Sequence, residues 1–124
     1  YLYAYIHTYV DLNPCSDLIT QIRISEHPFP IEKLRKEKVP RENRICQMCN
    51  ENKIADELHI IMFCKNSKIL QLRNAFLENI FKVNIELSKL SNDQLFLYIL
   101  LAVDVQLNFY FAIFLQKLFK LYIA

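Results

Sequence analysis

Three cysteines and one histidine lie within 19 residues of this chain, at spacings that suit a metal ion. Cys46 and Cys49 form a Cys-x2-Cys pair, and His59 and Cys64 follow it. Zn²⁺ prefers four thiolate and imidazole ligands in a tetrahedron, and four protein ligands leave no position for water. The spacing therefore predicts a closed Cys3His zinc site with a structural role, in which Cys46, Cys49, His59 and Cys64 are the ligands.

A second interpretation of the same residues stays open. Cys46 and Cys49 are then ordinary thiols of a core or a turn, and His59 is a hydrogen-bonded histidine of a helix. If His59 and Cys64 share one α-helix, their side chains point about 140° apart. Both then reach a single ion only if the helix loosens near Phe63.

The fourth cysteine, Cys15, stands outside this spacing, and we expect it to be a half-buried thiol. Disulfides stabilise small secreted domains that lack a sufficient core, whereas this chain has 124 residues and is 53% hydrophobic. We therefore expect reduced cysteines in an intracellular protein, nuclear or cytoplasmic. Because the first residue is Tyr1 rather than Met, we also expect a piece cut from a longer chain.

A basic segment leads into the cysteine pair. Residues 33–44 hold six Lys or Arg and two Glu, a local excess of four positive charges, although the whole chain carries only +2. Basic side chains bind nucleic acids by neutralising phosphates. Just before them, His27 and Phe29 offer rings on which an unpaired base could stack. The alternative is a solvated surface in which Glu37 and Glu42 offset the charge. The candidate nucleic-acid contacts are Arg35, Lys36, Lys38, Arg41 and Arg44.

The chain contains no glycine. P-loops and dinucleotide-binding fingerprints need glycine so that the backbone can approach phosphate closely, and the common nucleotide-binding enzymes are therefore excluded. His59 is assigned to the metal, and a loop histidine such as His27, between Glu26 and Pro28, is more often structural than catalytic. We expect no enzymatic activity.

Apolar residues recur at helical spacing along most of the chain, and no alternating strand pattern is present. The predicted helices cover residues 2–10, 16–22, 30–34, 55–62, 69–80, 91–102 and 107–122. Ser91 followed by Gln94 predicts a capping box. We therefore predict a single all-α domain over residues 1–124, with N-terminal helices and the basic segment in 1–45, the zinc loop in 46–64 and apolar helices in 65–124.

Residues 94–116 contain one charged residue, Asp104. A stretch of this length can span a membrane. However, Asp104, Gln106 and Asn108 lie in its middle, and a central aspartate is costly in the bilayer. Both halves also show the stripe of an amphipathic helix. This pattern favours a buried helical hairpin or a contact with another chain over a membrane span.

A longer pattern surrounds the cysteine pair. Its members are Arg23, Ser25, His27, Ile31, Glu32, Pro40, Arg44, Cys46, Cys49, Asp56, Glu57, His59 and Cys64. With these residues, segment 22–64 resembles the C-terminal zinc-binding segment found with reverse transcriptases of non-LTR retrotransposons. Leu34 stands where that family usually has glycine, and nothing in the chain resembles the polymerase itself. The resemblance implies an accessory module that helps to hold template RNA or target DNA.

Two functions are therefore expected as alternatives. The first is a non-catalytic zinc module of a retrotransposon-like reverse transcriptase that contacts RNA or DNA. The second is a domesticated structural or interaction domain, whose apolar C-terminal helices contact a protein partner, the rest of a larger polyprotein or a second copy of the chain.

Overall fold

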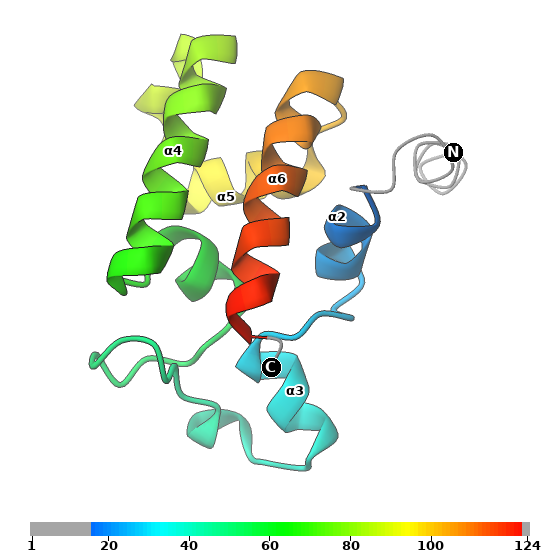
Figure 1. Ribbon diagram of the computed structural model, residues 1–124, viewed down its shortest axis with the longest axis vertical. Helices are drawn as coiled ribbons and strands as arrows, with labels where there is room; N and C mark the ends of the chain where they lie inside the picture. Colours follow the sequence, from blue (N-terminus) through cyan, green and yellow to red (C-terminus); the bar gives the residue numbers. More distant parts are fainter. Residues whose placement is uncertain (1–15, 123–124) are drawn as a thin grey trace.

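The computed structural model describes residues 16–122 (Figure 1). Its elements are α2 (Ser16–Arg23), α3 (Pro30–Lys36), η1 (Arg41–Asn43), η2 (His59–Phe63), α4 (Ser67–Val83), η3 (Ile85–Lys89), α5 (Asn92–Leu101) and α6 (Val105–Tyr122). Within this range there is no β-strand, only one isolated antiparallel bridge between Ile45 and Ile54. The prediction of a mainly α-helical fold is confirmed. The helix predicted over residues 2–10 and Cys15 lie outside the described residues.

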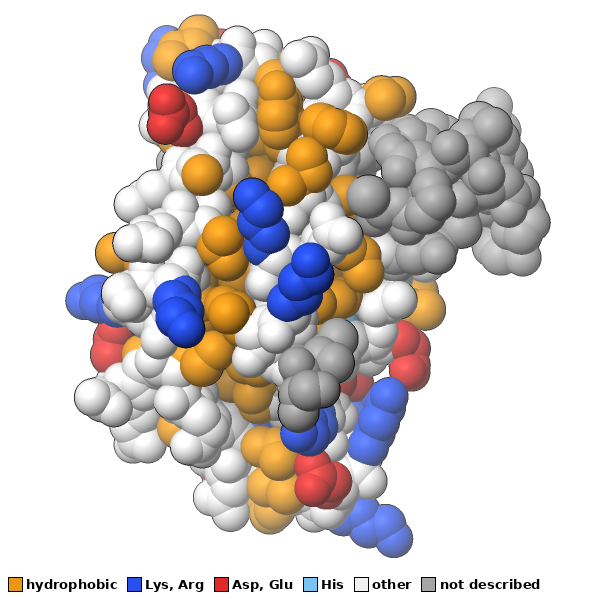
Figure 2. Space-filling model, viewed as in Figure 1, with side chains coloured by type: hydrophobic (Ala, Val, Ile, Leu, Met, Phe, Trp, Pro, Cys, Tyr) orange, Lys and Arg blue, Asp and Glu red, His pale blue; other side chains and the backbone are white. Residues whose placement is uncertain are grey.

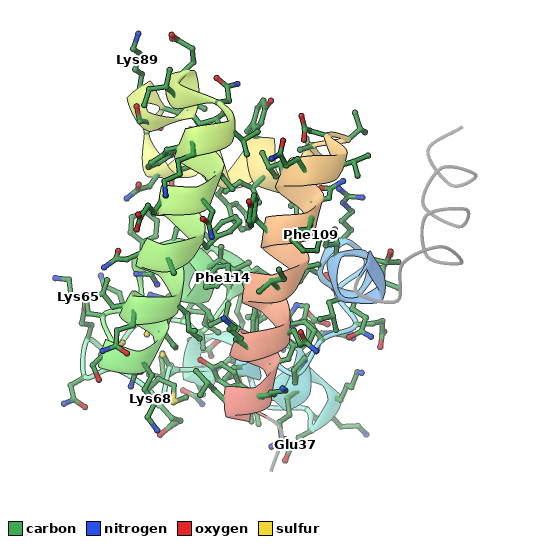
Figure 3. All side chains as sticks on the ribbon, turned by 45° about the horizontal axis from the view of Figure 1, so that its top comes forward. Glu37, Lys65, Lys68, Lys89, Phe109 and Phe114 are labelled. Atoms are coloured by element: carbon green, nitrogen blue, oxygen red, sulfur yellow. The ribbon has the colours of Figure 1, made fainter. Side chains whose placement is uncertain are left out.

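Helices α4 and α6 lie side by side and run in opposite directions through the centre of the fold (Figure 1). Phe76 of α4 stacks on Phe114 of α6, with ring centroids 4.8 Å apart, and contacts Phe111 at 5.7 Å. Phe114 points from α6 toward α4 (Figure 3). Because α6 buries apolar side chains on more than one face, it forms the central element of the core.

A bend separates α5 from α6, although the sequence between them is apolar. The Asp104 carboxylate accepts a hydrogen bond from the backbone N–H of Leu107 at 2.9 Å, which caps the first turn of α6. The two helices meet at 106°. No single helix in residues 16–122 is long and apolar enough to cross a membrane, and only this bent pair meets the criteria of length and composition together.

The N-terminal part packs against the other side of α6. The Arg23 guanidinium donates to the carbonyls of Leu100 and Ala102, at 2.7 and 3.0 Å, and ties α2 to the end of α5. Further on, Phe29 is fully buried against Phe119, with ring centroids 5.3 Å apart.

The burial of this region corrects one expectation. His27 and Phe29 are both buried, with exposed fractions of 6% and 0%. The two ring centroids lie 4.9 Å apart, and the Phe29 ring also packs against Phe119 and Tyr122 of α6. The expectation that they stack on a nucleic-acid base is therefore wrong, because the core already covers both rings.

The capping box predicted at the start of α5 is present. The Ser91 hydroxyl accepts from the backbone N–H of Gln94 at 3.2 Å, and the Gln94 side chain accepts from the Ser91 N–H at 3.1 Å. Two backbone donors that the helix itself leaves unpaired are thus satisfied.

Replacing this cap tests where α5 begins. Ser91→Ala should lower the free energy of unfolding by about 1 kcal/mol, measured by urea denaturation. Ser67→Ala is the matched control, since Ser67 is the first residue of α4 and the cap of that helix is Asn66. Equal losses in the two variants would contradict the assigned helix start.

Candidate metal centre

Four potential ligands converge at the lower end of the fold in Figure 1, below α4 and α6. The sulfur atoms of Cys46, Cys49 and Cys64 and a ring nitrogen of His59 all lie within 4.8 Å of one another. The Cys46 and Cys64 sulfurs are 3.8 Å apart, and the Cys49 sulfur is 3.4 Å from Nε2 of His59. The structure therefore brings all four predicted metal ligands into one cluster.

A narrow loop, closed by the bridge between Ile45 and Ile54, positions the first two cysteines. The Cys46 N–H donates to the Lys53 carbonyl at 2.8 Å, and the Ala55 N–H donates to the Arg44 carbonyl at the same distance. Asn52 turns the chain with a positive φ of 56°, a conformation that asparagine tolerates better than most residues other than glycine. The loop thus closes tightly without glycine.

Backbone donors also face the sulfur atoms. The N–H groups of Met48 and Cys49 hydrogen-bond the Cys46 sulfur, and the N–H of Asn66 hydrogen-bonds that of Cys64. Such donors favour the thiolate form. Burial nevertheless dominates: it raises the pKa of Cys46 and raises that of Cys64 to about 12. The thiols therefore keep their protons at neutral pH unless a cation replaces them.

A π-helix places His59 and Cys64 on the same side. In η2 the Cys64 N–H donates to the carbonyl of His59, five residues earlier, at 2.6 Å. An α-helix pairs residues four apart, and the wider turn reduces the angular offset between these two side chains. The sequence predicts that the helix loosens near Phe63, and the structure confirms it, because the π-helix ends at that residue.

Both ends of this short helix are held by side chains. At its start, the Asp56 carboxylate accepts from the His59 N–H at 2.8 Å. Beyond it, the guanidinium of Arg73, from α4, donates to the carbonyls of Ile61 and Ile60 at 2.7 and 3.0 Å. The element that carries His59 is thus fixed from two directions.

Arg73 is a residue that the sequence analysis missed. It is 5% exposed and forms no ion pair within the described residues. Burial lowers its pKa, while the nearby Cys64 acts in the opposite direction. The signal was present in the sequence, since Arg73 interrupts the apolar stripe of Ile69, Phe76 and Ile80. A buried cation close to Cys64 is a feature that negative charge on this sulfur would stabilise.

Two of the five predicted nucleic-acid contacts pair with acids that precede the basic segment of residues 33–44. Arg35 lies 2.7 Å from the carboxylate of Glu32, and Lys36 lies 3.0 Å from that of Glu26. The local excess of positive charge is therefore smaller in three dimensions than along the sequence.

The other three differ in their surroundings. Arg41 lies 3.7 Å from Asp56. This pair connects the basic segment to residues 46–64, which hold the four candidate ligands and are called the metal loop below. Arg44 is partly buried and donates to the carbonyls of Val39 and Ile31, so its role is to hold the chain path. Lys38 is exposed. The structure does not gather the five side chains into one continuous surface of unpaired charge.

His27 pairs with Glu57, two residues before the candidate ligand His59. Its Nε2 lies 2.7 Å from the Glu57 carboxylate, and its Nδ1 accepts from the Phe29 N–H at 3.3 Å. Because Nδ1 is an acceptor, Nε2 carries the proton and donates it to Glu57. Both ring nitrogens are thus occupied, and the pair links the segment before α3 to the metal loop.

Removing the guanidinium of Arg73 tests its role. Arg73→Met keeps most of the apolar stem but leaves two buried carbonyls without donors, and should lower the free energy of unfolding by about 2–4 kcal/mol. Lys82→Met is the control in the same helix, because Lys82 is exposed and its pair with Glu78 is worth about 0.5 kcal/mol or less. Urea denaturation with metal present measures both. Similar losses would contradict the assigned role.

Comparison of the chain with protein-family models, with curated proteins and with solved structures finds no match in any of the three. No relative of known function therefore indicates a role for the cluster.

Proposed function

We propose that this chain is a non-catalytic accessory module in which one zinc ion stabilises a helical fold that contacts RNA or DNA. The ligands are Cys46, Cys49, His59 and Cys64. The observation that supports the proposal is the convergence of their four donor atoms within 4.8 Å.

The distances suit zinc. With Zn–S near 2.3 Å and Zn–N near 2.0–2.1 Å, tetrahedral geometry separates two sulfurs by about 3.8 Å, and a sulfur from a nitrogen by about 3.5 Å. The observed separations are 3.8 Å for Cys46 and Cys64, and 3.4 Å for Cys49 and His59. Thiolate and imidazole ligands favour zinc over the hard cations magnesium and calcium.

The charge balance also fits a divalent ion. Three thiolates and one divalent cation leave a net charge of −1, and the buried guanidinium of Arg73 supplies the opposite charge. A buried charge is otherwise costly. The negative charge of the zinc–thiolate cluster thus offsets the cost of burying Arg73, and the guanidinium of Arg73 offsets the cost of burying the cluster.

A structural role follows from how many segments the ion would connect. The ligands come from the loop that holds Cys46 and Cys49, from η2 and from Cys64, which directly follows η2. Asn66, which caps α4, also donates to the Met48 carbonyl at 2.9 Å. Four protein ligands leave no open position for a substrate. The two occupied ring nitrogens of His27 likewise support a role without catalysis.

The association with a retrotransposon-like reverse transcriptase rests on the resemblance of residues 22–64. The exposed basic residues beside the metal loop, among them Lys38 and Arg41, support contact with nucleic acid. Pairing with Glu26, Glu32 and Asp56 limits the number of phosphates that the basic segment can neutralise.

One observation favours the second candidate, a protein-interaction domain. The corner between α5 and α6 exposes large apolar side chains and encloses a hollow of about 790 Å³. Figure 2 shows hydrophobic side chains gathered over the upper part of α6. Exposed apolar patches of this kind mark contact surfaces. The exposed residues are Leu97, Tyr98, Leu101, Val103, Val105 and Phe109. Sedimentation distinguishes the candidates, since a monomer without a partner counts against this one.

Metal analysis tests the zinc site. The chain purified in reducing buffer should contain one equivalent of zinc, and Cys46→Ala or His59→Ala should lose both the metal and the cooperative unfolding transition, because the binding free energy is part of the folding free energy. Cys15→Ala is the control and should keep one equivalent. A chain without metal, in which Cys46 and Cys49 oxidise to a disulfide, would contradict the proposal.

Titration with labelled single-stranded RNA and DNA tests the nucleic-acid contact. Binding should be measurable at 50 mM salt, and the logarithm of the association constant should fall linearly with the logarithm of the salt concentration, because bound phosphates release their counterions. A response that does not change with salt, or no binding at 50 mM, would refute the contact. Fluorescence anisotropy is the readout.

A further inference from the structure

We propose that the metal loop itself carries a binding site for single-stranded nucleic acid, in which one unpaired base stacks on Phe63 and Lys53 and Lys65 contact the flanking phosphates. This inference rests on the nucleic-acid contact proposed above and moves it away from residues 33–44. The site is a hollow of about 640 Å³ on the outer side of the loop. Its lining is Glu51, Asn52, Lys53, Ile54, Asp56, Leu58, His59, Phe63 and Lys65.

The aromatic platform follows from the π-helix. Because His59 and Cys64 turn their donor atoms inward, the last residue of η2, Phe63, is left at the surface and is 41% exposed. The residues before it, Ile60 to Met62, are buried. An exposed ring on a rigid, metal-braced turn has little conformational entropy left to lose on binding. Stacking on such rings is the main way in which proteins bind unpaired bases.

The charges around the ring suit phosphate. Lys53 and Lys65 line the hollow, are exposed, and form no ion pair within the described residues. Lys68, in the first turn of α4, projects from the same end of the molecule as Lys65 (Figure 3). These three side chains would flank a strand whose base lies on Phe63.

The acids of the hollow do not cancel this charge. Asp56 already accepts from the His59 N–H at 2.8 Å and lies 3.7 Å from the guanidinium of Arg41. Glu51 is the other acid in the lining. The two lysines of the lining, Lys53 and Lys65, therefore face Glu51 as the one carboxylate of the hollow without an ion pair among the described residues.

A single strand fits this surface better than a duplex. One aromatic ring in a hollow can stack on a base only when that base is unpaired and turned outward. In the basic segment, by contrast, the rings of His27 and Phe29 are buried and Arg35 and Lys36 pair with acids. The metal loop thus combines a ring and unpaired cations where the basic segment does not.

The first test separates stacking from packing. Zinc-loaded wild-type chain and variants are titrated with fluorescein-labelled U12, dT12 and a 12-base-pair duplex at 50 mM salt. Phe63→Leu keeps an apolar side chain but removes the aromatic face, and should weaken single-strand binding about 5- to 150-fold. Phe63→Trp should retain it. Phe109→Leu is the matched control, since Phe109 is 48% exposed on α6, and should bind as wild type does.

The second test counts phosphates. Lys53→Gln and Lys65→Gln should each reduce the slope of log K against log salt by about 0.7. Lys89→Gln is the control, because Lys89 lies at the opposite end of the molecule (Figure 3), and should leave the slope unchanged. Comparing U12 with dT12 shows whether the site distinguishes ribose from deoxyribose.

The outcomes separate this site from the function it rests on. If the wild type binds neither single strand at 50 mM salt, the nucleic-acid contact fails as a whole. If it binds, but Phe63→Leu, Lys53→Gln and Lys65→Gln leave affinity and slope unchanged while Arg35→Gln and Lys36→Gln weaken binding, the site is overturned and the function stands. Equal or tighter binding of the duplex also overturns the site. Each variant must first show one equivalent of zinc.

Discussion

The lower end of this fold depends on one electrostatic constraint, the packing of three thiol groups and an imidazole within 4.8 Å of one another, with Cys49 half-buried and the other three residues buried. Burial raises the pKa of two of the thiols, and that of Cys64 reaches about 12. The surroundings nevertheless offer the sulfurs backbone N–H donors and the guanidinium of Arg73. Protonated thiols need neither. These surroundings favour thiolates over thiols, and the thiolate is the form in which cysteine binds a metal ion, which supports the proposed site.

The same constraint explains the irregular backbone around the cluster. The candidate ligands come from a loop, from a π-helix and from the residue that follows it, and regular helix geometry would turn His59 and Cys64 apart. The wider turn leaves the carbonyls of Ile60 and Ile61 to be satisfied from outside, and Arg73 donates to both. Phe63 is displaced to the surface by the same turn. The π-helical turn thus accounts for three features: the approach of His59 to Cys64, the hydrogen bonds of the buried Arg73 and the exposure of the Phe63 ring.

The sequence predicts most of this arrangement because the relevant signals are local. The Cys-x2-Cys pair, the capping box at Ser91 and the loosening near Phe63 depend on spacing over a few residues, and the structure agrees with each. The surroundings of charges and rings are not local. Glu26 and Glu32 reach Arg35 and Lys36 only through the fold, and Phe29 is covered by α6, some 90 residues later. The roles of Arg73 and of the hollow at Phe63 likewise depend on contacts that no short window contains.

The central claim is that the four residues hold one ion in a tetrahedral Cys3His site. The absorption spectrum of the chain titrated with Co²⁺ under reducing conditions tests it most directly, because the visible bands of Co²⁺ report its coordination number and the near-ultraviolet band reports thiolate ligation. The account predicts intense tetrahedral bands with a thiolate-to-metal charge-transfer band, saturating at one equivalent and removed by Zn²⁺. A weak, octahedral-type spectrum without the charge-transfer band would contradict it.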